Sequence, residues 1–384
     1  MKTISVLIPD GDDPMAIEVI RSLGLTQHVT VDIMTSHRWP SSRLSRFCRR
    51  CHFTTSDITD KDRCDAILKT IATVPVDVLL PVSVAGIRLI VGERQAFARH
   101  VALPPLPDSD LLDIANDKTA LCRLAKHHGV SVPPFLAFPD EVPEHRALLR
   151  LAYPVLLKPP SLSGGRGFRL FHEPQTLAKF LEKNSSLGKR STHNLLQSYL
   201  PGTDLGLNVL CRNGEILAFT VQENILSASP PFGPATGIQF VQDAHVLEVG
   251  RKLLSTLRWN GVANLDMLRC ATTGETVLLE MNPRYWATLM GSVYAGVNFP
   301  YLSCLAALDM PFPSTDYRLI TYTGKSLALK QALRMTAGRP FLAGFRFRNT
   351  EVWAALTDPL PTLASYWKRM LNKRRRGRSK SERC

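Results

Sequence analysis

The chain has 384 residues, a length that suggests two or three domains. Of these residues 45% are hydrophobic and 21% charged, a composition typical of a globular protein. It contains no apolar run of about 18 residues, so no membrane-spanning helix is predicted, and its N-terminus reads as a first strand rather than a signal peptide. The net charge of +14 is uneven, because residues 368–384 hold nine Lys or Arg and one Glu, which leaves +6 on the rest. The basic charge therefore says little about the body of the chain.

Strands and helices alternate through the first hundred residues. Strands are predicted at Ile4–Pro9, Val29–Met34 and Val76–Pro81, and helices begin at Pro14 and span Cys64–Thr73. This alternation favours a parallel sheet with helices on both faces. A G-x-G-x-x-G fingerprint is absent, so dinucleotide binding is disfavoured.

The cysteines indicate a reducing, cytoplasmic setting. Eight are scattered along the chain without an export signal. Cys48–His52 matches the C-x-x-C-H pattern of haem attachment and also half of a zinc site, but no second half follows at a suitable spacing. Cysteines without a cofactor are the preferred interpretation.

A boundary is predicted at Pro104–Pro107, followed by a helix capped by Asn116 or Asp117. Lys118 lies in the first turn of this helix, where the helix dipole favours acids instead. Two interpretations remain open, an ordinary surface lysine and a lysine that reaches for a phosphate.

A glycine-rich segment follows the predicted strand Tyr153–Lys158. Gly164, Gly165 and Gly167 lie between this strand and the next, Phe168–Phe171. Backbone N–H groups of such a loop can close over an anion. It is not a Walker loop, since a strand and not a helix follows, and a simple turn is the alternative.

The next segments alternate again before a long irregular stretch. Ile225–Phe240 is rich in Pro, Ser and Gly and is predicted to be a loop of the kind that often covers a substrate. The elements expected around it are a helix at Pro174–Lys183, strands at Asn194–Leu200, Leu205–Cys211 and Glu215–Gln222, and a helix at Val246–Leu257.

Val262–Trp286 predicts a hairpin of two apolar strands joined by a Thr-Gly turn. If the hairpin centres on Thr273, Asp266 lies opposite Glu280, and Asn282 and Arg284 share a face with Glu280. Opposed carboxylates repel unless a cation lies between them, and carboxylate and amide oxygens suit Mg²⁺. An ordinary hairpin with solvated acids is the alternative.

The order of these motifs over about residues 1–310 resembles the ATP-grasp superfamily. The most specific segments are Val155–Pro159, Gln197–Asp204 and Leu279–Trp286. They are closest to its carboxylate–amine ligases and to the carbamoyl-phosphate synthase large-subunit-like group. The resemblance implies an α/β and α+β chain with an ATP-grasp fold.

The resemblance also implies a domain division. A Rossmann-like parallel-sheet domain preceding the ATP-grasp domain is expected at residues 1–108. The ATP-grasp domain would span residues 109–312, with a small lid subdomain at about 130–200 and a larger catalytic subdomain at 201–312. An extension with an amphipathic helix and a basic tail would occupy residues 313–384.

Site residues follow from the resemblance position by position. Those implied to bind ATP are Lys118 and Lys158 on its phosphates, Gly164, Gly165 and Gly167 in the covering loop, Gln197, Tyr199 and Leu200 around adenine, and Asp204 on the ribose. Those implied to hold Mg²⁺ are Asp266, Glu280 and Asn282, and the catalytic residues are Arg284 and Lys158. Many relatives carry Glu in place of Asp266 and of Gln197, but both residues here keep oxygen ligands or acceptors.

The implied activity is an ATP- and Mg²⁺-dependent ligase, with Mn²⁺ as an alternative metal. A carboxylate would become an acyl phosphate, which an amine attacks with release of ADP and phosphate. Alternatives are a carboxyphosphate-forming enzyme and a non-catalytic nucleotide-binding protein. The expected partners are a small carboxylate and a small amine, whose identities the sequence leaves open, and a second copy in a homodimer.

A last helix is predicted after Asp358–Pro361. Its apolar residues Leu363, Tyr366, Trp367, Met370 and Leu371 recur at helical spacing, next to basic residues. The main interpretation is a helix packed on the body with a frayed basic end. Attachment to an anionic membrane surface or to nucleic acid through the basic tail is the alternative.

Overall fold

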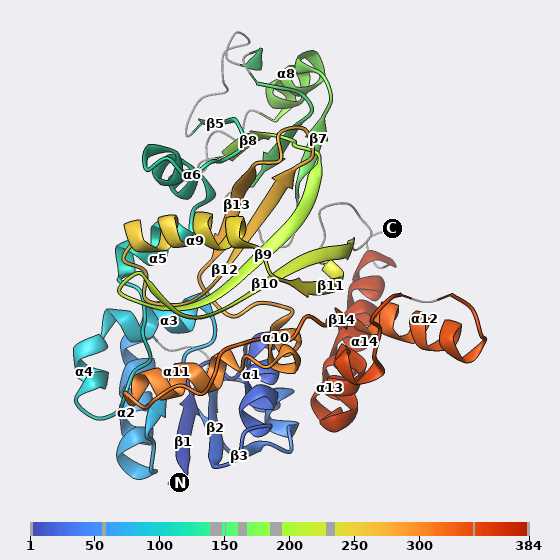
Figure 1. The fold of residues 1–384 in the computed structure, drawn as a ribbon. Helices are drawn as coiled ribbons and strands as arrows, with labels where there is room; N and C mark the ends of the chain where they lie inside the picture. Colours follow the sequence, from blue (N-terminus) through green and yellow to red (C-terminus); the bar gives the residue numbers. More distant parts are fainter. Residues whose placement is uncertain are drawn as a thin grey trace. The chain divides into compact units, whose positions relative to one another are not determined.

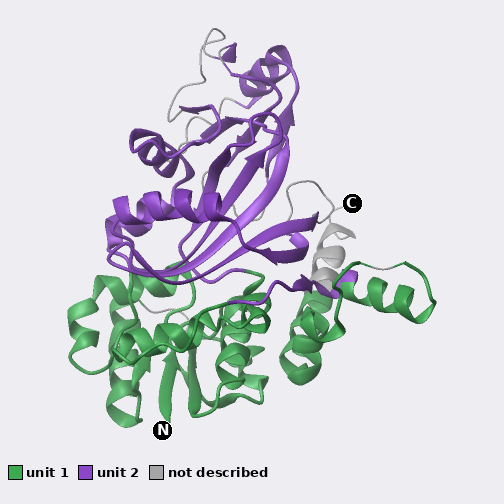
Figure 2. Ribbon diagram, viewed as in Figure 1, with its two compact units in different colours: residues 1–106, 287–316, 328–384 green, residues 107–286, 317–327 purple. Residues whose placement is uncertain are grey.

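A computed structural model of the chain describes residues 3–55, 59–138, 148–149, 151–159, 167–184, 194–227, 235–340 and 342–381, with side chains of the last helix given up to residue 371. Two units can be distinguished (Figure 2). Unit 1 comprises Met1–Leu106, Ala287–Asp316 and Ala328–Cys384, and unit 2 comprises Pro107–Trp286 and Tyr317–Leu327. The division expected at residues 108 and 312 stays a prediction.

Unit 1 contains the predicted parallel sheet. Its strands are β1 (Ile4–Ile8), β2 (Val29–Thr35), β3 (Cys48–Phe53) and β4 (Val78–Leu79), in the order β3-β2-β1-β4 (Figure 1). The sheet is parallel throughout, because each connection carries a helix or a long loop across before the next strand. The fold class expected for this part of the chain is confirmed.

The helices of unit 1 begin where the sequence supplies caps. Asp13 accepts a hydrogen bond from the backbone N–H of Met15 and starts α1 at Pro14. Thr59 and Asp62 form a capping box that starts α2 four residues before the predicted Cys64. The helices are α1 (Pro14–Gly24), α2 (Asp60–Thr73), α3 (Val84–Gly92), α4 (Arg94–Ala98), α10 (Leu289–Ala295), α11 (Phe299–Ala307), α13 (Glu351–Thr357) and α14 (Pro359–Ser381), with 3₁₀ turns η1 (Ser42–Leu44) and η3 (Phe347–Asn349).

The C-x-x-C-H segment is strand β3, which the sequence reasoning missed. Its basic residues pair with an acid of the neighbouring strand: Arg49 Nε lies 2.8 Å from Asp32 Oδ1, and His52 Nε2 lies 3.3 Å from Asp32 Oδ2. Burial raises the pKa of the Cys48 thiol to about 12 and that of Cys51 to about 11. These features describe a sheet edge and give no support to a haem or zinc site.

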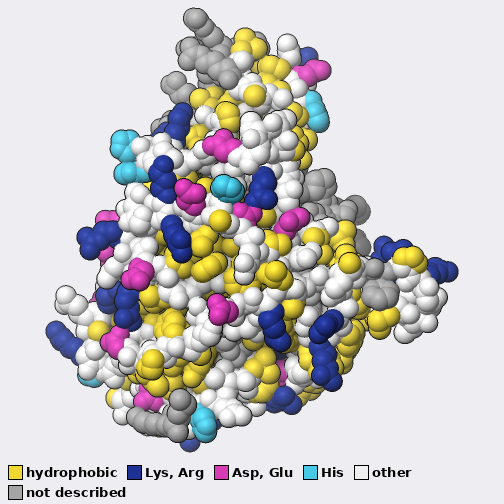
Figure 3. Space-filling model, in the orientation of Figure 1, with side chains coloured by type: hydrophobic (Ala, Val, Ile, Leu, Met, Phe, Trp, Pro, Cys, Tyr) yellow, Lys and Arg dark blue, Asp and Glu magenta, His cyan; other side chains and the backbone are white. Residues whose placement is uncertain are grey.

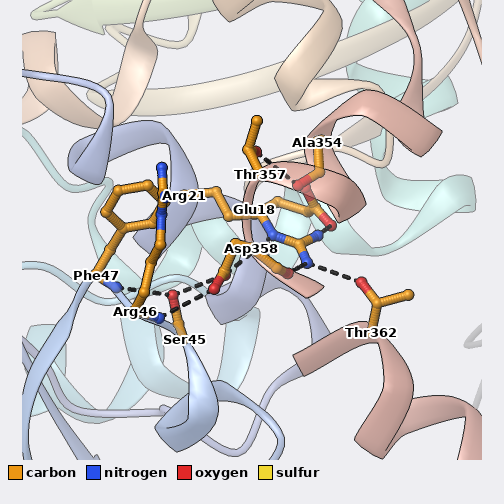
Figure 4. A network of polar contacts seen from close by, with 9 residues as sticks. All are labelled: Glu18, Arg21, Ser45, Arg46, Phe47, Ala354, Thr357, Asp358 and Thr362. Carbon is orange, nitrogen blue, oxygen red and sulfur yellow. Dashed lines mark hydrogen bonds and ion pairs between the residues drawn. The ribbon is translucent and has the colours of Figure 1, made fainter. Parts of the chain in front are cut away.

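A buried ion pair joins the first helix of unit 1 to its last (Figure 4). The guanidinium of Arg21 in α1 donates from Nε to Asp358 Oδ2 at 3.3 Å and from Nη2 to the Asp358 carbonyl at 2.7 Å and Thr362 Oγ1 at 2.8 Å. The Asp358 carboxylate also accepts from Ser45 Oγ and from the Arg46 amide. This network fixes the start of α14, and it orients the helix with Thr362 on its packed side.

The apolar stripe predicted to pack α14 on the body does not do so. Leu360, Leu363, Tyr366, Trp367, Met370 and Leu371 are all exposed. Because polar contacts of Asp358 and Thr362 set the rotation of the helix, its large apolar residues face away from the packed side. The prediction of a packed stripe is therefore wrong.

Unit 2 is built on a six-stranded sheet in the order β13-β12-β9-β10-β11-β14 and a four-stranded sheet in the order β5-β8-β6-β7. The strands of the large sheet are β9 (Gly202–Arg212), β10 (Glu215–Ser227), β11 (Ala235–Val241), β12 (Gly261–Cys270), β13 (Thr276–Asn282) and β14 (Thr321–Thr323). Those of the small sheet are β5 (Phe135–Phe138), β6 (Val155–Lys158), β7 (Arg169–Phe171) and β8 (Asn194–Ser198). The helices are α5 (Ser109–Asn116), α6 (Lys118–His127), α8 (Pro174–Lys183) and α9 (Ala244–Thr256), and α12 (Lys325–Thr336) runs from this unit into unit 1.

One face of the large sheet is apolar and lies under α9, as Figure 1 shows. Val246, Leu253 and Leu254 of α9 pack against alternate residues of β9 and β12, among them Leu207 and Leu265. Helix and sheet approach so closely that a Cβ at Gly250 would lie 2.1 Å from Leu207 Cδ2. Because strand residues alternate between faces, the intervening residues of β9 and β12 are directed to the opposite face.

The predicted loop Ile225–Phe240 is mostly strand. Ile225 continues β10, and Ala235–Phe240 belong to β11, which pairs with β10 in an antiparallel hairpin. The prolines that suggested a loop, Pro230, Pro231 and Pro234, all lie between the two strands in the sequence, so the predicted loop extended too far at both ends. The residues between the two strands, 228–234, lie outside the described part of the chain. None of the described helices is long and apolar enough to cross a membrane.

Candidate active site

The hairpin β12–β13 brings the predicted acids together in the expected register. Asp266 is the cross-strand partner of Glu280, and Asn264 is the partner of Asn282. These four residues lie on the face of the sheet opposite α9. The Asn282 amide Nδ2 donates to Asp266 Oδ2 at 3.1 Å and to Glu280 Oε1 at 3.3 Å. One amide therefore bridges both carboxylates.

The site concentrates negative charge, with a lysine close to it. Burial raises the pKa of Asp266 well above its usual value, and the neighbouring carboxylates of Glu280 and Asp204 raise it further. Lys118 Nζ lies 3.3 Å from Glu280 Oε2, and the lysine is largely buried. Of the two interpretations of Lys118, a plain surface residue is thus wrong, since its ammonium sits at the acids.

Arg284 follows the strand and lies beside Asn282. Its Nη1 donates to the Tyr285 carbonyl at 2.8 Å, and its Nη2 to Asn282 Oδ1 at 3.4 Å. The guanidinium thereby holds the Asn282 amide with the nitrogen directed to the acids. Its positive charge also lowers the pKa of Asp266, against the larger effect of burial.

A row of hydrogen-bonded amides, called the amide ladder below, lies beside the acids on the same face of the sheet. The sequence reasoning missed it. Asn282 Nδ2 also donates to Asn264 Oδ1 at 3.2 Å, and Asn264 Nδ2 donates to Asn208 Oδ1 at 3.1 Å. Asn208 Nδ2 in turn donates to Thr220 Oγ1 and Gln222 Oε1, both at 3.1 Å. The ladder crosses four strands in one row, so each amide fixes the orientation of the next. The signal available in the sequence was a buried-type position taken by Asn within each of two apolar segments, Asn208 in 205–211 and Asn264 in 262–270.

Lys158, at the end of β6, is buried and directed at Gln197. Its Nζ donates to Gln197 Oε1, and it lies 5.4 Å from the centre of the Phe168 ring. Burial lowers the pKa of Lys158, an effect that the carboxylate of Glu280 opposes. Gln197 Nε2 contacts Cys122 Sγ at 3.8 Å. The strand-end lysine and the acid hairpin are therefore close enough to influence each other's charge.

The glycine-rich loop is only partly described. Gly164 and Gly165 lie outside the described residues. Gly167, two residues before β7, has φ +77°, a conformation that residues with a Cβ rarely adopt. The prediction of an anion-binding loop therefore rests on its sequence.

The residues expected around adenine and ribose follow β8. Tyr199 is exposed, and its amide donates to the Pro154 carbonyl at 2.8 Å, which ties this segment to β6. Leu200 packs on a small apolar cluster with Leu268, Cys270 and Val277. Asp204 keeps access to solvent, yet the protein around it raises its pKa by desolvation while the Lys158 ammonium lowers it. Their roles toward a nucleotide stay predictions.

The donor set is of the kind that suits Mg²⁺. Two carboxylates and an amide converge on one face of the sheet, and carboxylate and amide oxygens are ligands that Mg²⁺ takes in proteins. Within the described chain, no three His, Cys, Asp or Glu side chains form a metal-binding group. Asn282 would present its oxygen only after its amide turns over, because Oδ1 now accepts from Arg284.

Comparisons with known proteins relate the chain to ATP-grasp proteins. Residues 190–326 match a family model described as ATP-grasp in the biosynthetic pathway with Ter operon. A segment of 217 residues, 55% of this chain, is 26% identical to the carbamoyl phosphate synthase large chain of Clostridium beijerinckii, of which it covers 19%. The chain thus spans about a fifth of that relative's length.

Two solved structures share the fold. The biotin carboxylase–βγ-ATP complex from Campylobacter jejuni superposes with a TM-score of 0.64 at 14% identity, over 82% of this chain and 73% of that one. The L-amino acid ligase from Bacillus licheniformis does so with a TM-score of 0.59 at 17% identity, over 84% and 78%. The resemblance that the motifs predicted is confirmed: the chain has the ATP-grasp fold, and its residues 190–326 carry the sequence of an ATP-grasp family.

Proposed function

We propose that the chain is an ATP- and Mg²⁺-dependent ligase that activates a small carboxylate as an acyl phosphate and transfers the acyl group to an amine. One observation carries the proposal: Asp266, Glu280 and Asn282 converge on one sheet face with Arg284 beside them and Lys118 against Glu280. A carboxylate is a poor electrophile, and phosphorylation by ATP gives it a leaving group. The proposal is supported by the match to an ATP-grasp family model and by the fold shared with an L-amino acid ligase.

The residues divide this work by position. Asp266, Glu280 and Asn282 would hold Mg²⁺, which supplies neutralising charge for the phosphates. Lys118 and Lys158 would bind phosphate oxygens, with Lys118 exchanging its present carboxylate partner for the nucleotide. Arg284 would stabilise the charge that develops on the transferred phosphoryl group. Gln197, Tyr199, Leu200 and Asp204 would hold the nucleoside.

A carboxyphosphate-forming enzyme is the second candidate. It is favoured by the biotin carboxylase among the structures that share the fold and by the carbamoyl phosphate synthase relative. The L-amino acid ligase, with comparable coverage, favours the amide-forming reaction. The two candidates differ in whether bicarbonate or an organic acid accepts the phosphoryl group.

The test is phosphate release from Mg²⁺-ATP with amino acids and dicarboxylates, offered singly and in pairs, with bicarbonate as a separate arm. Release that needs one acid and one amine, with an adduct of matching mass, supports the ligase, and bicarbonate dependence selects the second candidate. Glu280→Ala is expected to lose at least about a hundredfold in rate. Glu215→Ala, an exposed acid at the far end of β10, is the matched control and retains the rate. Unchanged release in Glu280→Ala would remove the metal assignment.

The remaining expectations belong to this proposal. The small-molecule partners are the acid and the amine, and Mn²⁺ is expected to replace Mg²⁺. A cytoplasmic setting agrees with the free cysteines of the described chain.

A further inference from the structure

Helix α14 turns its apolar side to solvent. Leu363 is 62% and Trp367 65% exposed, and Leu360, Met370 and Leu371 on the same side are exposed as well. Spacings of three and four residues place these side chains in one stripe. The opposite side carries Thr362, which accepts a hydrogen bond from the buried Arg21. A surface helix usually buries its apolar stripe, so this helix presents a surface that another body is expected to cover.

A second segment of unit 1 extends this surface. Trp39, which precedes η1, is 62% exposed, and the Arg43 guanidinium lies 4.9 Å from its ring centre. The Lys368 ammonium of α14 donates to the Trp39 carbonyl, so the two segments are joined. Trp39, Arg43, Leu363, Trp367 and Lys368 are called the α14 surface below. Figure 3 shows, on the face it draws, Lys and Arg side chains interspersed with hydrophobic ones.

The positive charge of the residues at the C-terminal end of α14 favours an anionic partner. Residues 368–384 contain nine Lys or Arg and one Glu. Each basic residue near an anionic lipid surface strengthens binding roughly fivefold. Tryptophan and leucine beside Lys and Arg are the composition of helices that lie in the membrane interface.

We propose that the α14 surface docks unit 1 on an anionic lipid surface, with Leu363 and Trp367 entering the interfacial region and the basic residues contacting headgroups. A second copy of the chain is disfavoured as the occupant, since it would bring two tails of like charge together. Nucleic acid would satisfy the charges but would leave the leucines without an apolar partner.

The experiment is sedimentation of the full chain with vesicles of phosphatidylcholine alone and with about a third phosphatidylglycerol. Binding is expected only to the anionic vesicles and to weaken as salt increases. Leu363→Gln/Trp367→Gln is expected to weaken binding by at least about tenfold through lost apolar burial. Changing Lys373, Arg374, Arg375 and Arg376 to Gln is expected to weaken it by at least about a hundredfold, at roughly fivefold per charge.

The controls separate docking from damage. Leu319→Gln changes a residue of unit 2 that is 57% exposed, and it should bind anionic vesicles as the unaltered chain does. All variants replace exposed or terminal side chains, and unchanged thermal unfolding verifies that they fold. Failure of the unaltered chain to bind anionic vesicles would overturn the proposal. So would a dimer that Leu363→Gln/Trp367→Gln converts to a monomer, or RNA binding that depends on the basic residues while vesicle binding does not.

Discussion

Replacing Arg21 by Met tests how the last helix of unit 1 is held. Arg21 is 2% and Asp358 1% exposed, so the guanidinium and the carboxylate are both out of water. The substitution keeps the aliphatic stem but removes donors from Asp358, Thr362 and Glu18. The carboxylate would then keep only the Ser45 hydroxyl and the Arg46 amide.

Breaking a buried pair from one side costs about 3–5 kcal/mol, because an uncompensated charge remains. We expect Arg21→Met to lose about 3 kcal/mol, the lower end of that range, since two donors stay on Asp358. At about 2–4 °C per kcal/mol, the melting temperature falls by about 6–12 °C. The assay is thermal and urea unfolding followed by circular dichroism.

The double variant Arg21→Met/Asp358→Leu decides the mechanism. It removes the stranded charge, so it should recover at least half of the loss. Arg251→Met, an exposed arginine of α9, should change stability by less than about 0.5 kcal/mol. A loss below about 1 kcal/mol in Arg21→Met, or additive effects in the double variant, would refute the reasoning.

Three further predictions concern unit 2 and the end of α1. Asn264→Ala breaks the amide ladder and removes the donor to Asn208 Oδ1, so we expect the free energy of unfolding to fall by about 1–3 kcal/mol. We also expect weaker Mn²⁺ binding, measured by electron paramagnetic resonance. Unchanged Mn²⁺ binding would mean that the ladder is only structural. Lys158→Met is expected to raise the Kd for Mg²⁺-ATP at least about tenfold in calorimetry, whereas equal affinity would exclude Lys158 from the nucleotide site. Gly24→Ala would place a Cβ 2.2 Å from Phe47 Cγ and should lower the free energy of unfolding by about 1–3 kcal/mol. If this clash is the cause, Gly24→Ala/Phe47→Ala, which removes the ring, should lose no more than Gly24→Ala alone.

Local patterns predicted most of the elements. The register of the β12–β13 hairpin was predictable because a short turn and two-residue alternation leave one pairing that keeps the apolar residues on one face. Helix starts at Pro14 and Lys118 were predictable because Asp13 and Asp117 cap them through their own side chains.

What escaped prediction depends on contacts distant in sequence. The β3 strand pairs with β2, where Arg49 and His52 both contact Asp32, a contact that no local pattern reveals. The amide ladder requires knowing that β9 lies between β10 and β12. The rotation of α14 is set by Arg21, 337 residues before Asp358. Amphipathic spacing alone therefore identified the stripe but not the side on which it lies.

The order of segments in the two units has a consequence for synthesis of the chain. Residues 107–286 of unit 2 are translated between two parts of unit 1, and unit 1 receives its last part, residues 328–384, after unit 2 has its final strand. Arg21 can therefore pair with Asp358 only after a further 337 residues have been synthesised. Unit 2 is expected to acquire its structure first on the ribosome, and closure of unit 1 is expected to be the late event that makes the product resistant to proteases.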